Sequence, residues 1–287
     1  MTEFKARYGR HANKGGHQVT ESDTATESGH LPLAGGTVKE SITIAMETSS
    51  RMGSIAVGIG DRCLQEHTFS GPMQHATELL PAVELLMDDI GFSPADIGVV
   101  AVSIGPGSFT GVRIAVMAAR TLSQVLGCRL VGVPTTEVLA LNAPQDGSVP
   151  IGVVLDARRG MIFAACYQWV SASVEGGAGG MGPVLQTLLE PTLGDPKEIL
   201  ARWPRNIQLL GEGIAYHRDA IDGAGLDSRV LEPATAVPRA AALYRLGRWR
   251  ADRGEFTARD ALLPLYLRKP EAQELWEARH GESQGQG

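Results

Sequence analysis

Two acidic residues are the side chains of this sequence best placed to do chemistry. Glu47 and Asp156 each end an apolar run, and each is followed by a short polar turn with a glycine and then a second apolar run. Carboxylates at such strand ends can contact a ligand, or they can cap the turns in which they lie. Both interpretations stay open from the sequence alone.

A glycine-rich loop at 105–111 is the third candidate site. It reads Gly-Pro-Gly-Ser-Phe-Thr-Gly between an apolar run and a helical pattern. Glycines allow backbone conformations that other residues disfavour, and a hydroxyl here can cap the helix that follows. The loop lacks both the P-loop ending and the glycine spacing of a dinucleotide-binding turn. It is therefore either a ligand site or a structural turn, formed by Gly105, Gly107, Ser108, Thr110 and Gly111.

Arg113 follows this loop, at the second position of a helix that we predict over 112–126. The helix dipole disfavours a cation so close to the amino end. We therefore expect Arg113 to meet a carboxylate or an anionic ligand.

The elements that position these residues follow from hydrophobic periodicity. Apolar and alternating runs predict strands at 42–46, 53–59, 62–69, 99–104 and 129–133, then at 151–156, 161–167, 184–189 and 207–210. Helical spacing predicts helices at 75–90, 112–126 and 240–253, with short helices after Pro134 and Pro196. The second half thus repeats the opening pattern of the first, which predicts two α/β halves around a cleft.

These elements divide the chain into four predicted segments. We expect a disordered tail at 1–38, an N-terminal lobe at 39–145, a C-terminal lobe at 146–270 and a flexible tail at 271–287. The tails are polar and lack periodicity, whereas the two lobes have the apolar content of folded domains.

Composition excludes several classes of protein. The 287-residue chain has a net charge of −6, which argues against a nucleic-acid binder that works through a broad basic surface. No apolar run approaches the roughly 20 residues that a membrane span needs. The odd cysteine count (Cys63, Cys128 and Cys166) indicates a reducing compartment, and we expect a cytoplasmic protein.

Several motifs together resemble the TsaB family, also known as YeaZ or the Gcp-like non-catalytic subunit. They are ETSS (47–50), GPGSFTGVR (105–113), GVPTTE (132–137), LDARRG (155–160), LLGEG (209–213) and PLYLR (264–268). The resemblance extends from about residue 42 to residue 268, and GPGSFTGVR is its most specific part.

The resemblance implies a two-lobed actin-like ATPase (ASKHA) fold, which hexokinase and Hsp70 share. It also implies a scaffold role beside the catalytic TsaD subunit and the TsaE ATPase. Together these proteins add a threonylcarbamoyl group to N6 of adenosine 37 in tRNAs that read codons starting with A. The chain would contact tRNA through the complex, form a homodimer when alone, and carry no cofactor.

The residues bear on whether this chain does chemistry itself. The catalytic relative holds a metal with two histidines four residues apart on one helix, but here His75 is followed by Leu79 at that spacing. Glu47 stands where kinases and ATPases of this fold usually carry aspartate. These departures favour a non-catalytic subunit. The alternative is a nucleotide-binding kinase or ATPase of the same fold.

The family places its partner contact on the two helices that correspond to 75–90 and 112–126. Apolar and small side chains on them are the candidate interface. They are His75, Leu79, Val83, Met87, Ala115, Ala118, Ala119 and Leu122. The alternative is that these side chains face the core of this chain, because both helices have apolar residues on more than one side.

Overall fold

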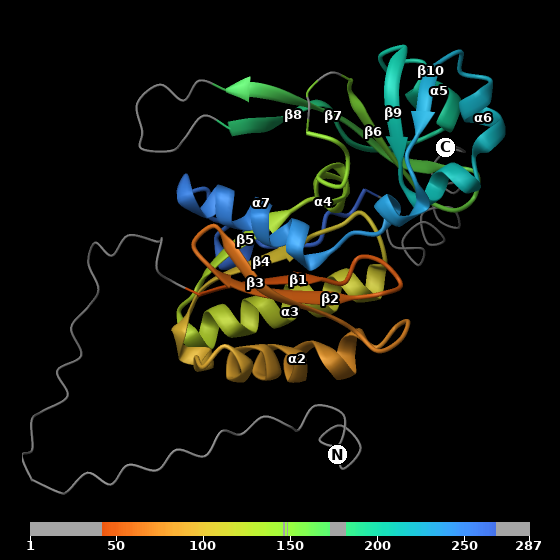
Figure 1. Cartoon of the computed structure of the whole chain (residues 1–287). Helices are drawn as coiled ribbons and strands as arrows, with labels where there is room; N and C mark the ends of the chain where they lie inside the picture. The colour runs from red at the N-terminus through yellow and green to blue at the C-terminus, as the bar shows by residue number, and fades with distance from the viewer. Residues whose placement is uncertain (1–41, 146, 148, 173–181, 268–287) are drawn as a thin grey trace, which may run out of the picture. The chain divides into compact units, whose positions relative to one another are not determined.

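The computed structural model describes residues 42–145, 147, 149–172 and 182–267. Within them, five strands form a first sheet with the order β3-β2-β1-β4-β5 (Figure 1). The strands are β1 (Ile42–Glu47), β2 (Ser54–Ile59), β3 (Arg62–Thr68), β4 (Ile97–Ser103) and β5 (Arg129–Val133). Strands β1, β2 and β3 pair antiparallel, whereas β4 pairs parallel with β1 and with β5.

A second sheet repeats this arrangement with the order β8-β7-β6-β9-β10. Its strands are β6 (Ile151–Asp156), β7 (Ile162–Ala172), β8 (Gly182–Gly194), β9 (Asn206–Leu210) and β10 (Asp227–Val230). Again the first three strands in chain order pair antiparallel, and the last two run parallel to the first. Two mixed sheets of identical topology confirm the predicted internal repeat and the actin-like fold class.

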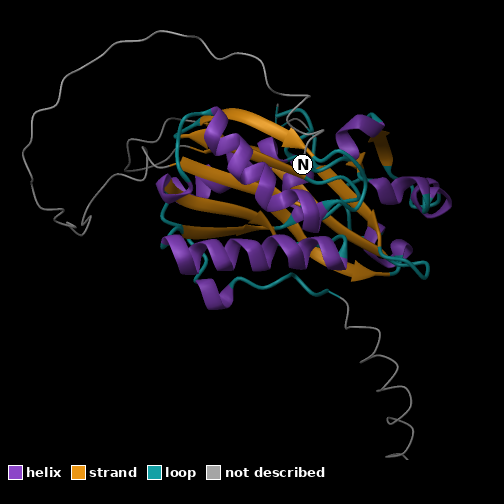
Figure 2. Cartoon of the chain, turned by 90° about the horizontal axis from the view of Figure 1, so that it is seen from below, coloured by secondary structure: helices purple, strands orange, loops and turns teal. Residues whose placement is uncertain are grey.

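Helices cover both faces of the first sheet. Helices α2 (His75–Asp89) and α3 (Phe109–Leu126) lie side by side on one face (Figure 2), and α7 (Ala240–Asp252) lies on the other. The shorter helices are α4 (Thr135–Ala140), α5 (Pro196–Leu200) and α6 (Arg218–Asp222), with 3₁₀ turns η2 (Pro94–Asp96), η3 (Glu212–Ala215), η4 (Pro233–Ala236) and η5 (Arg259–Ala261). No helix among the described residues is long and apolar enough to cross a membrane.

Large and small side chains alternate along the strands of the first sheet, and this alternation determines which helices pack on each face. In β1, Ile44 and Met46 belong to the core under α2 and α3, whereas Ala45 between them belongs to the core under α7. Successive side chains of a strand point to opposite faces, so the large side chains of β1 lie on one face of the sheet and the small Ala45 lies on the other. The small residues on the α7 side let that helix approach the sheet closely.

Helices α4 and α7 connect the two sheets through one shared core. This core joins residues of β1 and β4 to α4 and α7, and then to β6 and β7 of the second sheet. Polar contacts reinforce it: the hydroxyls of Thr136 and Tyr167 lie 2.7 Å apart, and Arg250 of α7 binds both carboxylate oxygens of Glu137 at 2.9 and 2.7 Å. Helix α7 follows the second sheet in the chain yet packs on the first.

Some predicted boundaries differ from the structure. Helix α3 starts at Phe109, three residues before the predicted start, while β7 and β8 extend beyond the predicted strands. Helix α6 and strand β10 were not predicted, because both are short and largely polar. The predicted tails at 1–38 and 271–287 lie outside the described residues, and the lobe boundary near residue 145 stays a prediction.

Close packing of α7 on the sheet predicts the effect of a substitution at Gly247. An added Cβ would lie 2.3 Å from the Cβ of Ala101, which is well inside van der Waals contact. We expect Gly247→Ala to lower the free energy of unfolding by about 1–3 kcal/mol, because overpacking outweighs the gain of up to about 1 kcal/mol in helix propensity. Denaturant unfolding measures the change. Gly71→Ala is the control, since its Cβ would meet only Gln74 at 3.8 Å.

Candidate functional site

The two candidate loops of the first sheet lie against each other. Strands β1 and β4 are parallel neighbours, so the loops that follow them leave the same edge of the sheet. The amide of Ser108 donates to the carbonyl of Ser49 at 2.6 Å, and the hydroxyl of Thr48 donates to the carbonyl of Gly111 at 2.7 Å. Residues 105–111 are therefore bound directly to the turn that follows Glu47.

Two glycines make this approach possible. A Cβ at Gly107 would lie 2.3 Å from the carbonyl oxygen of Ser49, and one at Gly111 would lie 2.0 Å from that of Thr48. No side chain fits at either position without separating the loops. The glycines therefore serve a close contact between two backbones.

The loop also starts helix α3, as predicted. Ser108 is the N-cap, and its hydroxyl accepts a hydrogen bond from the amide of Gly111 at 3.2 Å. Thr110, the other capping candidate, lies exposed in the first turn. Of the two candidates, the structure therefore assigns the cap to Ser108, three residues before the amide that it satisfies.

Glu47 is fully buried at the end of β1. One carboxylate oxygen accepts hydrogen bonds from the amide of Ser49 at 2.7 Å and from its hydroxyl at 2.5 Å. The other oxygen has no hydrogen-bond partner among the described residues. Burial raises the pKa of Glu47 more than the bonds from Ser49 lower it. Its geometry is that of a strand-end carboxylate that caps its own turn.

His75 is the first residue of α2, and its side chain is buried. Its Nε2 donates to the carbonyl of Ser50 at 3.0 Å, and its ring lies 5.8 Å from that of Phe69. The Nδ1 atom has no partner among the described residues, and burial lowers the pKa of the imidazole. His75 therefore links the start of α2 to the same turn that the glycine-rich loop contacts.

Asp156 has a comparable role in the second sheet. Its carboxylate accepts hydrogen bonds from the amide of Arg158 and from His217 Nε2, both at 3.1 Å. Its own amide donates to the carboxylate of Glu212 at 3.0 Å, and burial raises the pKa of that glutamate. Sequence analysis missed His217 and Glu212, although Glu212 lies in the LLGEG motif. No described contact joins this cluster to Glu47.

Arg113 meets no carboxylate among the described residues, so of the two expected partners only an anionic ligand stays a prediction. Its Nε donates to the phenol oxygen of Tyr266 at 2.7 Å, and its guanidinium lies 3.7 Å from the ring centre of Phe109. Because α3 starts at Phe109, Arg113 lies one turn into the helix, where the dipole opposes a cation less strongly. Sequence analysis missed Tyr266, which belongs to the PLYLR motif.

Most of the predicted partner residues lie in the core of this chain. His75, Leu79, Val83, Met87, Ala115 and Ala119 are buried, and Ala118 and Leu122 are partly buried. Large apolar side chains that stay exposed on these helices are Leu80 (54%), Phe109 (48%), Met117 (58%) and Val125 (73%). The predicted helix-pair interface stays a prediction, and these four residues are the accessible large apolar side chains of the two helices.

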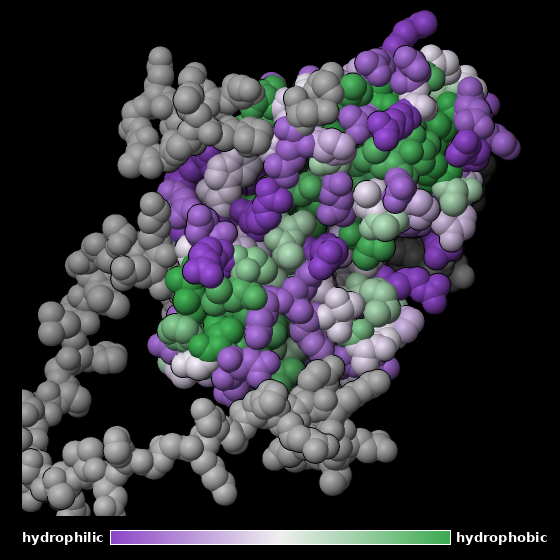
Figure 3. Space-filling view, in the orientation of Figure 1, coloured by the Kyte–Doolittle hydropathy of each residue, from purple (hydrophilic) through white to green (hydrophobic). Residues whose placement is uncertain are grey.

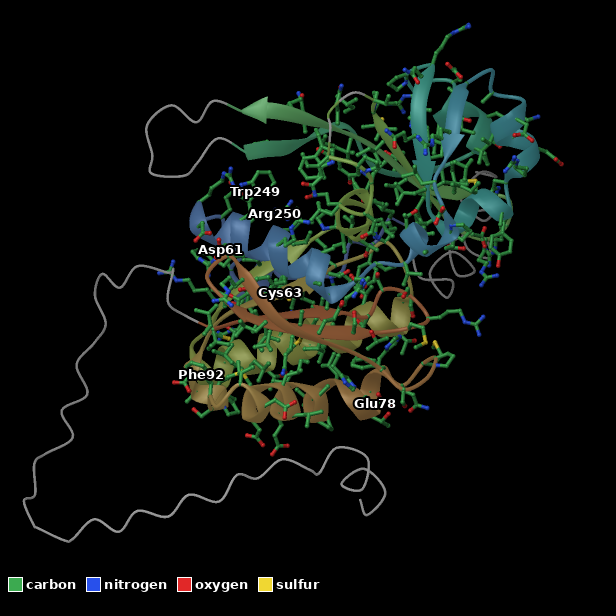
Figure 4. All side chains as sticks on the ribbon, viewed as in Figure 1. Asp61, Cys63, Glu78, Phe92, Trp249 and Arg250 are labelled. Carbon is green, nitrogen blue, oxygen red and sulfur yellow. The ribbon has the colours of Figure 1, made fainter. Side chains whose placement is uncertain are left out.

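The outer surface of these helices mixes polar and apolar groups. Figure 4 labels Glu78 near the start of α2 and Phe92 just after its end, and Phe92 is 39% exposed. In Figure 3, hydrophobic residues gather toward the side on which α2 and α3 end. Among the described residues, no group of three or more histidines, cysteines and acidic side chains is arranged to hold a metal ion.

Comparison with known proteins gives consistent matches. Residues 71–276 match the family model of TsaD, tRNA N6-adenosine threonylcarbamoyltransferase. The chain is 30% identical to the tRNA threonylcarbamoyladenosine biosynthesis protein TsaB of Bacillus subtilis, over 81% of this chain and 96% of that protein.

Solved structures agree with this match. An uncharacterized Pseudomonas aeruginosa protein with similarity to peptidase YeaZ has a TM-score of 0.65 at 27% identity. YeaZ from the same organism has a TM-score of 0.63 at 26% identity. Each match covers 79% of this chain and all of the other.

Gly111 tests the contact between the two loops. We expect Gly111→Ala to lower the free energy of unfolding by about 3 kcal/mol, because a Cβ at 2.0 Å from the Thr48 carbonyl must push the loops apart. Denaturant unfolding measures this change. Thr110→Ala, an exposed change in the same turn, should stay within about 0.5 kcal/mol of wild type. Equal stability of the two variants would contradict the tight contact.

Burial of Glu47 predicts a pH dependence of stability. Because the folded pKa of Glu47 is raised, the stability that its neutral form confers is present below the unfolded pKa and is lost as pH rises through the folded pKa. We expect Glu47→Gln to unfold at a higher temperature than wild type at pH 8, with the difference shrinking toward pH 4.5 (Glu47's ordinary pKa). Glu84→Gln, an exposed change on α2, controls for the lost charge. Parallel pH profiles of wild type and Glu47→Gln would refute this.

Proposed function

Because this chain belongs to the TsaB family of tRNA threonylcarbamoyladenosine biosynthesis proteins, we propose that it is the non-catalytic subunit of the complex that modifies tRNA. In this role it binds the catalytic TsaD subunit and supports it while threonylcarbamoyl is added to N6 of adenosine 37. The match to almost the full length of a curated TsaB carries the proposal. The reaction takes place on tRNA in the cytoplasm.

The polar groups of the first sheet support a scaffold role. In an actin-like ATPase, the turn after the first strand faces the phosphates of the nucleotide. Here that turn instead contacts residues 105–111, and its carboxylate, Glu47, is buried against Ser49. His75 uses its Nε2 within the chain, and Leu79 stands where a metal-binding relative would need a second histidine. No observation of the described residues favours the kinase or ATPase alternative.

Helices α2 and α3 supply the partner surface in this proposal. Leu80, Met117 and Val125 are exposed apolar side chains on the outer faces of these two helices. Ala118 is partly buried beside Met117 and leaves room for a second helix to approach. Apolar side chains of this kind form the centre of protein interfaces, and methionine adapts to an irregular partner. We propose that TsaD covers this face, and that a second copy of this chain covers it when TsaD is absent.

The remaining partners join through the assembled complex. The tRNA binds to the pair rather than to this chain alone, because the net charge of −6 gives this chain little general affinity for RNA. In this proposal the TsaE ATPase also joins the assembled pair.

Met117 provides the test of the partner surface. Size-exclusion chromatography with light scattering should give a one-to-one complex of this chain with TsaD from the same genome. We expect Met117→Arg to weaken the complex at least about tenfold, because it places an unpaired charge in an apolar interface. Leu188→Arg on β8, where the leucine is 43% exposed, is the matched control. Ala115→Arg is unsuitable, since Ala115 is fully buried.

Two outcomes would contradict this function. A complex that forms equally well with Met117→Arg would exclude the proposed face. Turnover of ATP by the lone chain, without a complex, would favour the nucleotide-binding alternative.

A further inference from the structure

Three side chains form an exposed group beside the glycine-rich loop, and we call Phe109, Arg113 and Tyr266 the aromatic–arginine cluster. The Arg113 guanidinium lies 3.7 Å from the ring centre of Phe109 and 5.4 Å from that of Tyr266. The two rings are 5.8 Å apart and tilted by 47°. Phe109 is 48% exposed and Tyr266 is 47% exposed, so a large part of each ring faces solvent.

The cluster is held from two directions. Phe109 and Arg113 are one turn apart on α3, whose start is fixed by the Ser108 cap and the contact with Ser49. Tyr266 lies near the carboxyl end of the described residues. Its neighbour Leu265 holds this segment in place, because the Leu265 amide donates to the carbonyl of Ile104 at 2.7 Å. The bond from Arg113 Nε to the Tyr266 oxygen closes the group. Its geometry is therefore preorganised before any ligand arrives.

The guanidinium of Arg113 has donors that are free to bind a ligand. Its Nε is bound to Tyr266, but its two terminal amino groups have no hydrogen-bond partner, and it forms no ion pair, among the described residues. A second exposed arginine, Arg51, lies two residues after Ser49, whose carbonyl binds the Ser108 amide. Exposed ring surface beside a planar cation suits a ligand that has both a flat ring and an anionic group.

We propose that the aromatic–arginine cluster binds one or two unpaired nucleotides of the tRNA held by the complex. Base stacking uses the exposed ring surfaces of both Phe109 and Tyr266, and the terminal amino groups of Arg113 bind a phosphate. The nucleotides must be unpaired, because a base within a duplex has no free face for the rings. This proposal rests on the proposed function, since an acidic chain gains a local RNA contact only when a partner brings the RNA to it.

The test measures RNA affinity of the whole complex. Anisotropy of a fluorescent anticodon stem-loop RNA reports binding to the assembled pair of this chain and TsaD. We expect Phe109→Leu and Tyr266→Leu each to raise the Kd about tenfold, the loss expected when a base loses a stacking ring. Arg113→Gln should weaken binding and reduce the slope of log Kd against log salt by about one, because one phosphate contact is lost.

A second cation–aromatic pair supplies the matched control. Arg253 lies 4.2 Å from the ring centre of Trp249 on α7, where Figure 4 labels the tryptophan. Trp249→Leu and Arg253→Gln remove the same chemistry elsewhere, and RNA affinity should not change. Light scattering of every variant shows whether the pair with TsaD still forms.

The outcomes separate this proposal from the proposed function. Unchanged RNA affinity in all three cluster variants overturns the nucleotide site. Loss of the pair with TsaD in these variants also overturns it, and assigns the cluster to a protein contact. If the wild-type chain forms no pair with TsaD, the proposed function fails. The nucleotide site then fails with it, because only the pair brings the RNA to this chain.

Discussion

The contact between the turn after β1 and the loop after β4 is the constraint on which the first half of this protein depends. Backbone atoms at Gly107 and Gly111 approach Ser49 and Thr48 too closely for any side chain to intervene. The same turn receives His75 at the start of α2, and the same loop provides the cap of α3. The turn after β1 is therefore bonded to the start of both outer helices.

This constraint also explains how polar residues are used. Glu47 and His75 resemble catalytic side chains in the sequence, yet in the structure they are buried and bonded to neighbouring backbone. Their hydrogen bonds hold the turn after β1 to its own backbone and to the start of α2. The proposed contacts with partners use exposed side chains instead, on α2 and α3 and in the aromatic–arginine cluster.

The second half of the chain completes the first. Helix α7 covers the open face of the first sheet, where Ala45, Ala56 and Ala101 leave room for it. Arg250 of α7 binds Glu137 of α4, and burial raises the pKa of that glutamate more than the arginine lowers it. Two repeated sheets thus share one core, which lies on the face of the first sheet opposite α2 and α3.

The sequence by itself determined what depends on near neighbours in the chain: most strands, the long helices, the repeat, a hydroxyl cap before α3 and the family. These features follow from periodicity and from hydrogen bonds within a few residues. Only the tertiary structure decided that Leu79 faces inward and Leu80 outward, because α2 has apolar residues on both sides. It also decided that Arg113 meets Tyr266, 153 residues away in the chain. Such a pairing depends on where two distant segments are brought together by packing, and no local pattern encodes that position.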